Sequence, residues 1–424
     1  MESVGVGLLG LGTVGTAVAR RLIGEWELLG ERAGATPVLR AVAVRDLSRP
    51  REVDLKNARL VADPGAVVAD PAIGIIVEAI GGTDPATALI ESSLRAGKTV
   101  VTANKAVMAE SGPRLTAIAA EHSARLYFEA SVGAGLPVIG LLRGSLLGDR
   151  IATLDCVING TTNVILTQMR TAGVSFEVAL ADAQRRGFAE ADPSLDVDGW
   201  DAVHKLVILA WLGLGSRVAP AAVDRVGIRH VAGADVAALA QLGYRVRLVA
   251  HAERAPGGAA VHLRVRPTAV ATGHLLHDVE DADNAVVISS DLAGRVMLRG
   301  LGAGGASTAS AVVSDIVTAV RERKAPADRA VSAPVEARLL TEEDVEVAGY
   351  VRIRLSPEAD ARALVLQALE DRGIPVDAAV DAPGSELIVL TGTAPRAVHD
   401  RALETLDTLT HVDEILGALD RAEA

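Results

Sequence analysis

The 424-residue chain carries 42 Lys and Arg against 54 Asp and Glu, a net charge of −12 that argues against nucleic acid and anionic membranes as partners. Half of the residues are hydrophobic and 23% are charged, a composition typical of a folded protein and not of a disordered one. At this length we expect two or three domains.

Cysteine usage and hydropathy bear on the compartment. A single cysteine, Cys156, excludes an internal disulfide and fits a reducing compartment, so we expect a cytoplasmic protein. No apolar run approaches the roughly 18 residues of a membrane span. Glu2 stands where a signal peptide needs positive charge. We therefore expect no membrane partner.

The N-terminus has the pattern of a dinucleotide-binding fold. Residues 4–9 predict a buried strand, the sequence GLGTVG follows directly, and a helix-like run begins at Thr16. In this context the glycines of G-x-G-x-x-G let the backbone approach a pyrophosphate at the helix N-terminus. The alternative is a tight glycine turn without a ligand. We assign to the cofactor site Gly10, Gly12, Thr13, Val14 and Gly15.

The next predicted strand, LRAVAVRD, ends at Arg45 and Asp46. An acidic residue at this place binds the ribose hydroxyls of NAD, whereas an arginine accommodates the 2′-phosphate of NADP. We favour NADP because of Arg45 and keep NAD as the alternative. Arg45 as an ordinary surface arginine also stays open.

Strands and helices continue to alternate through the first third of the chain. GIIVEAIGG, KTVVTANK and ARLYFEASVGAG predict strands, and residues 85–96 and 111–124 predict helices. This alternation predicts an α/β, doubly wound parallel sheet of the Rossmann type. The carboxyl ends of such strands face the ligand crevice, so we expect Gly81 and Lys105 beside the cofactor.

Beyond this region the pattern changes twice. Strand-like runs predominate over residues 136–305, which predicts a mainly antiparallel sheet in an α+β domain. Residues 1–135, with about 306–322 returning to them, form the expected dinucleotide-binding domain. Residues 323–346 are polar and contain proline, which predicts a linker. Residues 347–424 show a strand–helix–strand–strand–helix–strand order, typical of a ferredoxin-like module.

An acidic segment from Glu190 to Lys205 is the most informative part of the chain. It leads into a predicted helix whose apolar residues recur at i, i+3 and i+4, with Asp201 and Lys205 together on another side. One alternative is an exposed i,i+4 ion pair without function. A calcium loop starting at Ser194 is excluded, because its twelfth position needs Glu and holds Lys205.

Several blocks together resemble the homoserine dehydrogenase family. They are GLGTVG, ANKAV, EASVGAGLPVI, INGTTNVIL, the acidic segment with its lysine, and LGAGGASTASAVVSD. The resemblance covers about residues 1–320. The C-terminal module resembles an ACT domain, a small amino-acid-binding fold, through its layout.

The resemblance implies reversible, nicotinamide-dependent reduction of aspartate semialdehyde to homoserine, in the synthesis of threonine, methionine and isoleucine. Aldehyde reduction needs a proton at the carbonyl oxygen, and a positioned ammonium can supply it. The family pattern implies Lys205 as this acid, Asp201 as the group that keeps it charged, and Lys105 as a second catalytic or cofactor contact. It implies substrate binding by Glu190, Thr161 and Asp196. Further cofactor contacts are Gly187 and Gly302.

The segment EASVGAGLP resembles a cation site of the family. There a monovalent cation, typically sodium, is held by a glutamate and backbone carbonyls. The matching residues are Glu129, Val132, Ala134 and Leu136. Oxygen ligands of this kind suit a hard cation. Two departures, Ser307 and Leu301 where many members have other residues, affect the cofactor contacts.

Rival functions are weaker. A phosphorylating semialdehyde dehydrogenase needs a nucleophilic cysteine, and the only thiol, Cys156, stands in an apolar strand. A non-catalytic amino-acid sensor derived from a dehydrogenase would lack Lys205, Asp201 or Glu190, and all three are present. By resemblance we also expect a homo-oligomer, a dimer or tetramer, and threonine as an effector at the C-terminal module.

Overall fold

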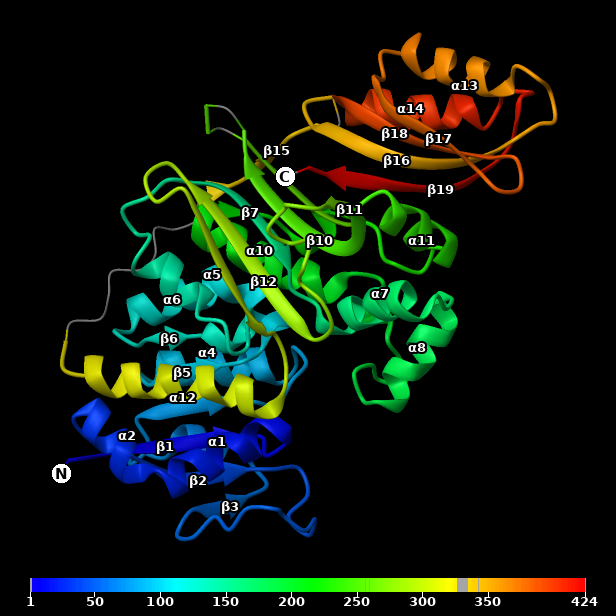
Figure 1. The fold of residues 1–424 in the computed structure, drawn as a ribbon. Coiled ribbons are helices and arrows are strands. Elements are labelled where there is room, and N and C mark those ends of the chain that lie inside the picture. Colours follow the sequence, from blue (N-terminus) through cyan, green and yellow to red (C-terminus); the bar gives the residue numbers. More distant parts are fainter. Residues whose placement is uncertain (1, 256, 259, 326–334, 342, 424) are drawn as a thin grey trace.

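The computed structural model describes residues 2–255, 257–258, 260–325, 335–341 and 343–423. It contains an α/β domain around the N-terminus, called the first domain below, a central domain, and a C-terminal module at the far end (Figure 1). Among the described residues, no helix is long and apolar enough to cross a membrane.

The first domain is built on a parallel sheet with strand order β3-β2-β1-β4-β5-β6. This order is that of a doubly wound dinucleotide-binding sheet, as the βα alternation predicts. Its strands are β1 (Ser3–Leu9), β2 (Thr36–Ala43), β3 (Arg59–Val61), β4 (Ile75–Glu78), β5 (Thr99–Thr102) and β6 (Leu126–Tyr127). Its helices are α1 (Thr13–Gly24), α2 (Trp26–Ala33), α3 (Pro64–Ala69), α4 (Ala86–Arg95) and α5 (Lys105–Glu121).

A helix from much later in the chain completes this domain. α12 (Gly305–Glu322) lies against the N-terminal helices in Figure 1, and its buried residues Val312, Ile316 and Val320 share one apolar core with α1 and β1. The short helix η1 (Glu129–Ser131) and α6 (Val138–Arg143) lead into the central domain.

The central domain places helices against one face of a sheet. Its long strands are β7 (Ile151–Val157), β10 (Tyr244–Arg254), β11 (Ala260–Ala271), β12 (Asp283–Ser290) and β13 (Arg295–Leu301). Short elements are β8 (Ser216–Arg217), η2 (Pro220–Ala222) and β9 (Asp224–Arg225). Its helices are α7 (Gly160–Ala172), α8 (Phe176–Arg185), α9 (Ser194–Val197), α10 (Trp200–Leu214) and α11 (Gly233–Gln241).

The expected predominance of antiparallel strands holds only for the five long strands of this domain. They pair antiparallel in the order β13-β12-β7-β10-β11, but β11 pairs parallel with β9, β15 (Arg338–Leu339) and β19 (Val412–Ala422). The sheet is therefore mixed, and it continues into the C-terminal module.

The C-terminal module has the predicted strand and helix order. It consists of β16 (Glu346–Leu355), α13 (Ala361–Glu370), β17 (Val376–Ala382), β18 (Glu386–Pro395), α14 (Arg396–Leu406) and β19. Its strands pair antiparallel in the order β19-β16-β18-β17. Within the expected linker, β14 (Val335–Glu336) pairs with β8 and β15 with β11. Linker residues 326–334 and 342 lie outside the described residues.

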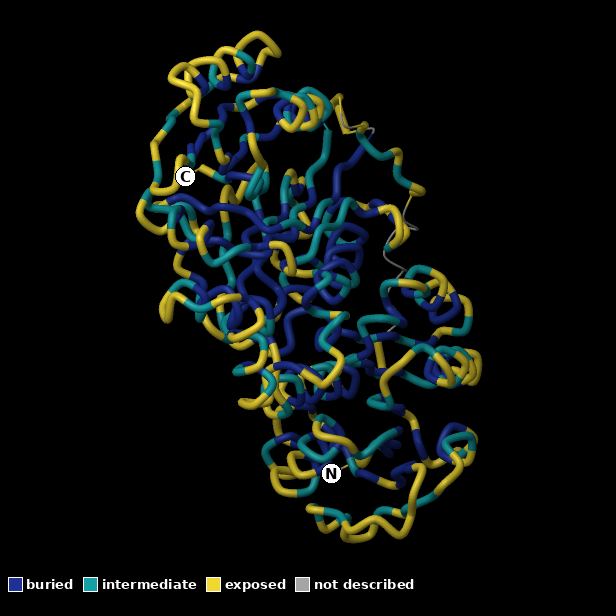
Figure 2. Tube along the Cα trace, turned by 90° about the vertical axis from the view of Figure 1, so that its right-hand side faces the viewer, coloured by how far each residue is buried: buried dark blue, intermediate teal, exposed yellow. Residues whose placement is uncertain are grey.

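Burial is greatest in the middle of the molecule, and exposed residues gather at its two ends (Figure 2). One apolar core joins α4 and α5 of the first domain to α7, α10 and the central sheet. The two domains therefore meet through packed side chains, and the candidate site lies at this junction.

Candidate active site

A pocket of about 1100 Å³ opens where the first and central domains meet. Lys105, Asp196, Asp201 and Lys205 line it with charged side chains. Thr161, Gly187 and Gly302 lie on its wall as well. Residues far apart in the sequence, most of those expected at the site, thus share one cavity.

Asp201 lies between two lysine side chains at the centre of this pocket. Its Oδ2 is 2.9 Å from Nζ of Lys205, and its Oδ1 pairs with the ammonium of Lys105. Lys205 also donates a hydrogen bond of 2.6 Å to the carbonyl oxygen of Ile158. One carboxylate therefore orients two ammonium groups.

Burial distinguishes this arrangement from an ordinary surface ion pair. The apolar stripe predicted on α10 is buried, including Val203 and Leu206, but Asp201 and Lys205 are also only 3% and 8% exposed. Lys105 is the accessible partner, with 43% of its side chain exposed. The alternative of a solvated i,i+4 pair on α10 is thus wrong.

The pKa values of the two lysines move in opposite directions. The negative charge of Asp201 raises the pKa of Lys105. Burial lowers the pKa of Lys205, although Asp201 opposes this shift. Burial opposes ionisation of Asp201, yet the charges of Lys205 and Lys105 hold its pKa well below the usual range. The site therefore holds one strongly basic amine and one more acidic ammonium.

Asn159 is a site residue that sequence reasoning missed. Its side-chain amide donates to Asp196 at 2.7 Å and to Asp201 at 2.8 Å, and its Oδ1 caps α7 by accepting from the amide of Thr162. An Asn followed by Gly and two Thr is a helix N-cap signal that would have found it. Burial and the charge of Asp201 raise the pKa of Asp196.

Lys105 reaches the pocket from a helix and not from a strand end. β5 ends at Thr102, and α5 begins at Lys105, earlier than the predicted start at residue 111. Asn104 caps α5 by accepting from the amide of Val107 at 3.2 Å, and its side chain donates to the carbonyl of Gly82 at 2.6 Å. The cap fixes where the helix begins, and so it fixes the backbone position from which the Lys105 side chain extends.

The three expected substrate-binding residues are placed differently, because Thr161 and Asp196 line the pocket and Glu190 does not. Thr161 donates a 2.7 Å hydrogen bond to the carbonyl of Phe188, which joins α7 to the acidic segment. Glu190 is exposed and does not line the pocket, but its charge contributes to the raised pKa of Lys105. The negative charges of Asp196 and Glu190 thus both raise the pKa of the Lys105 ammonium.

The glycine-rich turn has the shape that a bound dinucleotide needs. Gly10 adopts φ +96°, and a Cβ on Gly15 would lie 2.2 Å from the carbonyl oxygen of Gly10. A Cβ on Gly12 would meet nothing within 4 Å, so this face is open toward the N-terminus of α1, where Thr13 and Val14 begin the helix. These are the separate roles of the three glycines in a dinucleotide turn.

A second pocket, of about 1050 Å³, adjoins this turn. It is lined by Gly12 and Thr13 and by the side chains of Arg20, Arg49 and Arg51. Arg45 is exposed just after β2 and does not line it. Arg49 and Arg51 were missed because they stand in a loop without periodic structure.

Gly81 and Gly302 complete the expected cofactor surface. Gly81 follows β4 with φ +81°, and a Cβ there would meet nothing within 4 Å. A Cβ on Gly302 would lie 1.8 Å from Nδ2 of the fully buried Asn284. Only glycine fits at this position without moving the amide.

The segment expected to hold a cation surrounds a buried carboxylate. Glu129 accepts hydrogen bonds from the amides of Ile139 at 2.8 Å and Gly140 at 2.6 Å. Burial raises the pKa of Glu129, and burial together with the Glu129 charge raises the pKa of Asp315 to about 8. Ala134 has φ +50° in the turn between Val132 and Leu136. This left-handed conformation turns the backbone, so the carbonyl groups before and after Ala134 point in different directions. The buried carboxylate and the backbone carbonyls of this turn are oxygen ligands of the kind that a hard cation takes, and the carbonyl of Leu136 also accepts from the amide of Val138 at 2.8 Å.

Comparison with known proteins identifies the family of this chain. Residues 137–317 match the family model described as homoserine dehydrogenase, and residues 10–129 match the model described as its NAD binding domain. A homoserine dehydrogenase of Synechocystis sp. is 44% identical over 325 residues, which cover 75% of this chain and 73% of the relative.

Solved structures give the same answer. A homoserine dehydrogenase from Thiobacillus denitrificans has a TM-score of 0.94 at 36% identity and covers 100% of this chain and 99% of its own. A hyperthermophilic archaeal homoserine dehydrogenase in complex with NADPH has a TM-score of 0.63 at 30% identity, over 77% of this chain and 100% of its own. This chain therefore belongs to the homoserine dehydrogenase family, NAD(P)-dependent oxidoreductases that act on a CH–OH group.

Proposed function

We propose that Lys205 is the proton donor when aspartate semialdehyde is reduced to homoserine. A bound nicotinamide cofactor supplies the hydride that reaches the aldehyde carbon. Two groups that accept from the Lys205 ammonium, Asp201 and the Ile158 carbonyl, leave its remaining N–H for the pocket. A lowered pKa makes this ammonium a better acid than an exposed lysine.

Lys105 has a different role in this proposal. Its raised pKa keeps it charged, and it faces the same pocket from the first domain. A permanent positive charge at this place polarises the aldehyde and stabilises negative charge on its oxygen. The single observation that carries the mechanism is the shared carboxylate of Asp201, which points both ammonium groups at one cavity.

Steady-state kinetics of two variants distinguish these roles. Lys205→Met should lower kcat for semialdehyde reduction by about 10²- to 10⁴-fold, the usual contribution of a general acid, with little change in KM. Lys105→Met should lower kcat/KM, and its kcat should keep a pH dependence that Lys205→Met lacks. Equal, pH-independent losses in both variants would overturn the division of roles.

The substrate's ammonium and carboxylate have candidate partners at the rim. We assign Glu190 to the ammonium, Thr161 to a carboxylate or carbonyl contact, and Asp196 to a supporting position beside Asn159. Glu190→Gln should raise KM for homoserine, because a neutral amide loses the charge attraction. Its matched control is Glu110→Gln, on the exposed side of α5. An unchanged KM in Glu190→Gln would refute this assignment.

NADP is the proposed cofactor, with NAD as the alternative. Its support is the pair of arginines in the pocket at the glycine turn, Arg49 and Arg51, together with the NADPH bound to the archaeal relative, whereas Arg45 lies outside this pocket. Arg49→Ala should raise the Kd for NADPH much more than the Kd for NADH, measured by fluorescence titration. A lower Kd for NADH than for NADPH in the unaltered chain would favour NAD, and equal values would refute a preference for NADP.

We propose that a monovalent cation, sodium, binds Glu129 and the carbonyls of Val132, Ala134 and Leu136. It would offset the buried charge of Glu129 and brace the junction of the two domains. Sodium chloride should raise Tm above that in choline chloride, and Glu129→Gln should abolish this difference. The control is Glu121→Gln, on the exposed end of α5. The same Tm difference in Glu129→Gln would refute the site.

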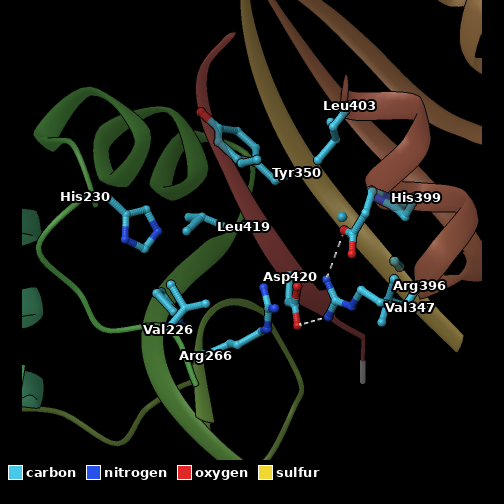
Figure 3. A pocket seen from close by; sticks show the side chains of 15 residues that line it. Val226, His230, Arg266, Val347, Tyr350, Arg396, His399, Leu403, Leu419 and Asp420 are labelled. Carbon is cyan, nitrogen blue, oxygen red and sulfur yellow. Dashed lines mark hydrogen bonds and ion pairs between the residues drawn. The ribbon is translucent and has the colours of Figure 1, made fainter. Parts of the chain in front are cut away.

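The C-terminal module is the proposed binding place of an amino-acid effector such as threonine. A pocket of about 460 Å³ lies between β16, β19 and α14 of the module and β11 of the central domain (Figure 3). Arg396 donates to Asp420 at 2.7 Å inside it, and Arg266 lies opposite. A guanidinium and a carboxylate are the partners that an amino acid's two charged groups need.

Threonine titration tests this effector site. Millimolar threonine should inhibit homoserine oxidation by the unaltered chain, and Arg396→Ala should raise the threonine concentration for half inhibition at least tenfold. Arg401→Ala, on the exposed side of the same helix, should leave it unchanged. Full inhibition of Arg396→Ala at the original concentration would place the effector elsewhere.

A homo-oligomer, dimer or tetramer, is also proposed. The candidate interface is the face of the central sheet turned away from α10, where Met297 of β13 is only half-buried. Light scattering should give a mass of at least two chains, and Met297→Lys should lower it. A monomer mass for the unaltered chain would end this proposal.

A further inference from the structure

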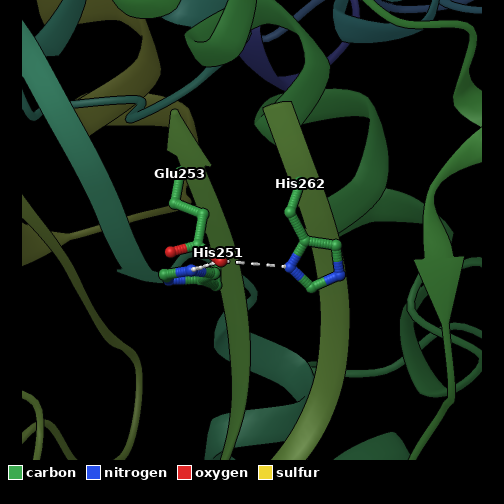
Figure 4. A group of neighbouring side chains, drawn as sticks. All are labelled: His251, Glu253 and His262. Atoms are coloured by element: carbon green, nitrogen blue, oxygen red, sulfur yellow. Dashed lines mark ion pairs between the residues drawn. The ribbon is translucent and has the colours of Figure 1, made fainter. Parts of the chain in front are cut away.

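Three metal-ligand side chains meet on a face of the central sheet that the catalytic site does not use. His251 and Glu253 project from β10, and His262 projects from β11 (Figure 4). Glu253 stands directly opposite His262 in the antiparallel register. Leu154 and Cys156 of β7 lie in the apolar core with α10, so Asp155 between them points to the other face of the sheet. His251 is paired with Asp155 in the register of β10 and β7, so the cluster also lies on the face turned away from α10.

We propose that His251, Glu253 and His262 form a site for a divalent transition-metal ion of the zinc class. One ligand atom from each of the three side chains lies within 4.8 Å of the others. Glu253 Oε1 is 3.5 Å from Nδ1 of His262 and 3.7 Å from Nε2 of His251. A tetrahedral zinc with bonds of about 2.0–2.2 Å separates its ligand atoms by about 3.4 Å. The side chains therefore need to move only slightly.

The hydrogen bonds around the cluster leave the required lone pairs available. Nδ1 of His251 is 2.7 Å from Asp155 Oδ1, on the neighbouring strand β7. A carboxylate at this nitrogen holds its proton, which leaves Nε2 as the ligand, an arrangement common around protein-bound zinc. Nδ1 of His262 is buried and has no hydrogen-bond partner among the described residues. An ion would satisfy this atom.

Charge also favours a dication. With both imidazoles neutral, Asp155 and Glu253 give the cluster two negative charges, which a divalent ion neutralises. Arg264 lies on the same face, but it is 3.4 Å from Asp420 and thus has its own counter-ion. Two imidazoles and one carboxylate suit zinc, cobalt or nickel better than calcium or magnesium, which prefer oxygen ligands. A tetrahedral ion with these three protein ligands would take a water molecule at its fourth position.

Cobalt titration of the full chain tests the site, because four-coordinate Co²⁺ absorbs visible light far more strongly than the hydrated ion. After removal of metals by chelation, one Co²⁺ per chain should produce this absorption at micromolar concentration, and Zn²⁺ should displace it. His262→Gln and Glu253→Gln should each weaken binding at least tenfold. His122→Ala, a half-buried histidine in the first domain, should bind as the unaltered chain does.

Thermal unfolding supplies an independent readout. Zn²⁺ should raise Tm of the unaltered chain and of His122→Ala, but not of His262→Gln. Homoserine oxidation should be the same with and without the metal, since the cluster lies on the sheet face opposite α10. Absence of Co²⁺ absorption, or equal affinity in His262→Gln, would overturn the site. The cluster would then be a hydrogen-bonded network only.

Discussion

At the scale of single residues, the proposed chemistry depends on one carboxylate that pairs with two ammonium groups. Asp201 is buried, and its two oxygens face Lys105 and Lys205. Burial alone would drive Lys205 toward the neutral amine, which could not donate a proton. The charge of Asp201 opposes this effect, and the charge of Lys105 adds to it. The acidity of Lys205 is thus set by its two neighbours.

The pH dependence of catalysis should report this balance. In the proposed mechanism semialdehyde reduction needs protonated Lys205, so its rate should fall as pH rises through the pKa of Lys205. Asp201→Asn removes the charge that raises this pKa, and the alkaline limb should move to lower pH. Lys105→Ala removes a charge that lowers it, and the limb should move to higher pH. The measurement is kcat against pH for both variants, and shifts in the same direction would contradict this account.

At the scale of elements, the glycine turn before α1 contains one glycine needed for packing and another that leaves space for a ligand. A Cβ on Gly12 meets nothing within 4 Å, whereas one on Gly15 collides with the backbone of Gly10. Gly12 faces the space where the proposed cofactor would lie, and the lack of a side chain at Gly15 lets α1 pack on β1.

Two alanine substitutions should therefore have different effects. Gly12→Ala should weaken cofactor binding at least tenfold with an unchanged Tm, because its methyl group enters only the cofactor's space. Gly15→Ala should lower the free energy of unfolding by about 1–3 kcal/mol, typical of overpacking. Gly24→Ala, where a Cβ meets nothing within 4 Å, is the control for both. Normal cofactor affinity in Gly12→Ala would show that the cofactor does not use this turn.

The elements that sequence reasoning predicted well are those with a strong local pattern. Strands β1, β2, β4 and β5, helices α1 and α4, the stripe on α10 and the order of the C-terminal module follow directly from periodicity. The short elements α2, β3 and α3 were not predicted. α7 was missed because its Thr, Val and Ile residues are typical of strands, although its Asn159 cap was visible. The early start of α5 was missed because it is marked by the cap residue Asn104 and not by the periodicity of apolar residues.

Contacts between distant segments were beyond the sequence. Nothing local predicts that β19 pairs parallel with β11, or that Lys105 would share Asp201 with Lys205. The roles at the pocket came from resemblance to the family. Geometry added Asn159, whose N-cap signal was overlooked, and Arg49 and Arg51, which have no distinctive spacing of their own.

At the scale of the whole molecule, the C-terminal module is joined to the catalytic half by buried polar contacts. Asp235 of α11 accepts from the hydroxyl of Tyr350 at 3.0 Å and from Nε of Arg352 at 2.7 Å, and it is 1% exposed. The pairing of β19 with β11 adds backbone hydrogen bonds. The module is therefore part of one continuous sheet and is positioned to influence the central domain.

Loss of this contact should loosen the module. Asp235→Ala leaves buried Arg352 without one of its two carboxylate partners, and should lower the free energy of unfolding by on the order of 3 kcal/mol. Urea denaturation measures this loss, and limited proteolysis should release a C-terminal fragment sooner. Asp407→Ala, at an exposed position after α14, is the control. Unaltered stability in Asp235→Ala would mean that the module is held by other contacts.

The most direct test of the whole account is homoserine oxidation by the unaltered chain and by Lys205→Ala, with NADPH binding measured on both. We predict turnover by the unaltered chain, and a loss of at least about 10²-fold in kcat for Lys205→Ala with an unchanged Kd for NADPH. Turnover by Lys205→Ala at the rate of the unaltered chain would contradict proton transfer by this residue. No turnover by the unaltered chain with either NADP or NAD would contradict the activity itself.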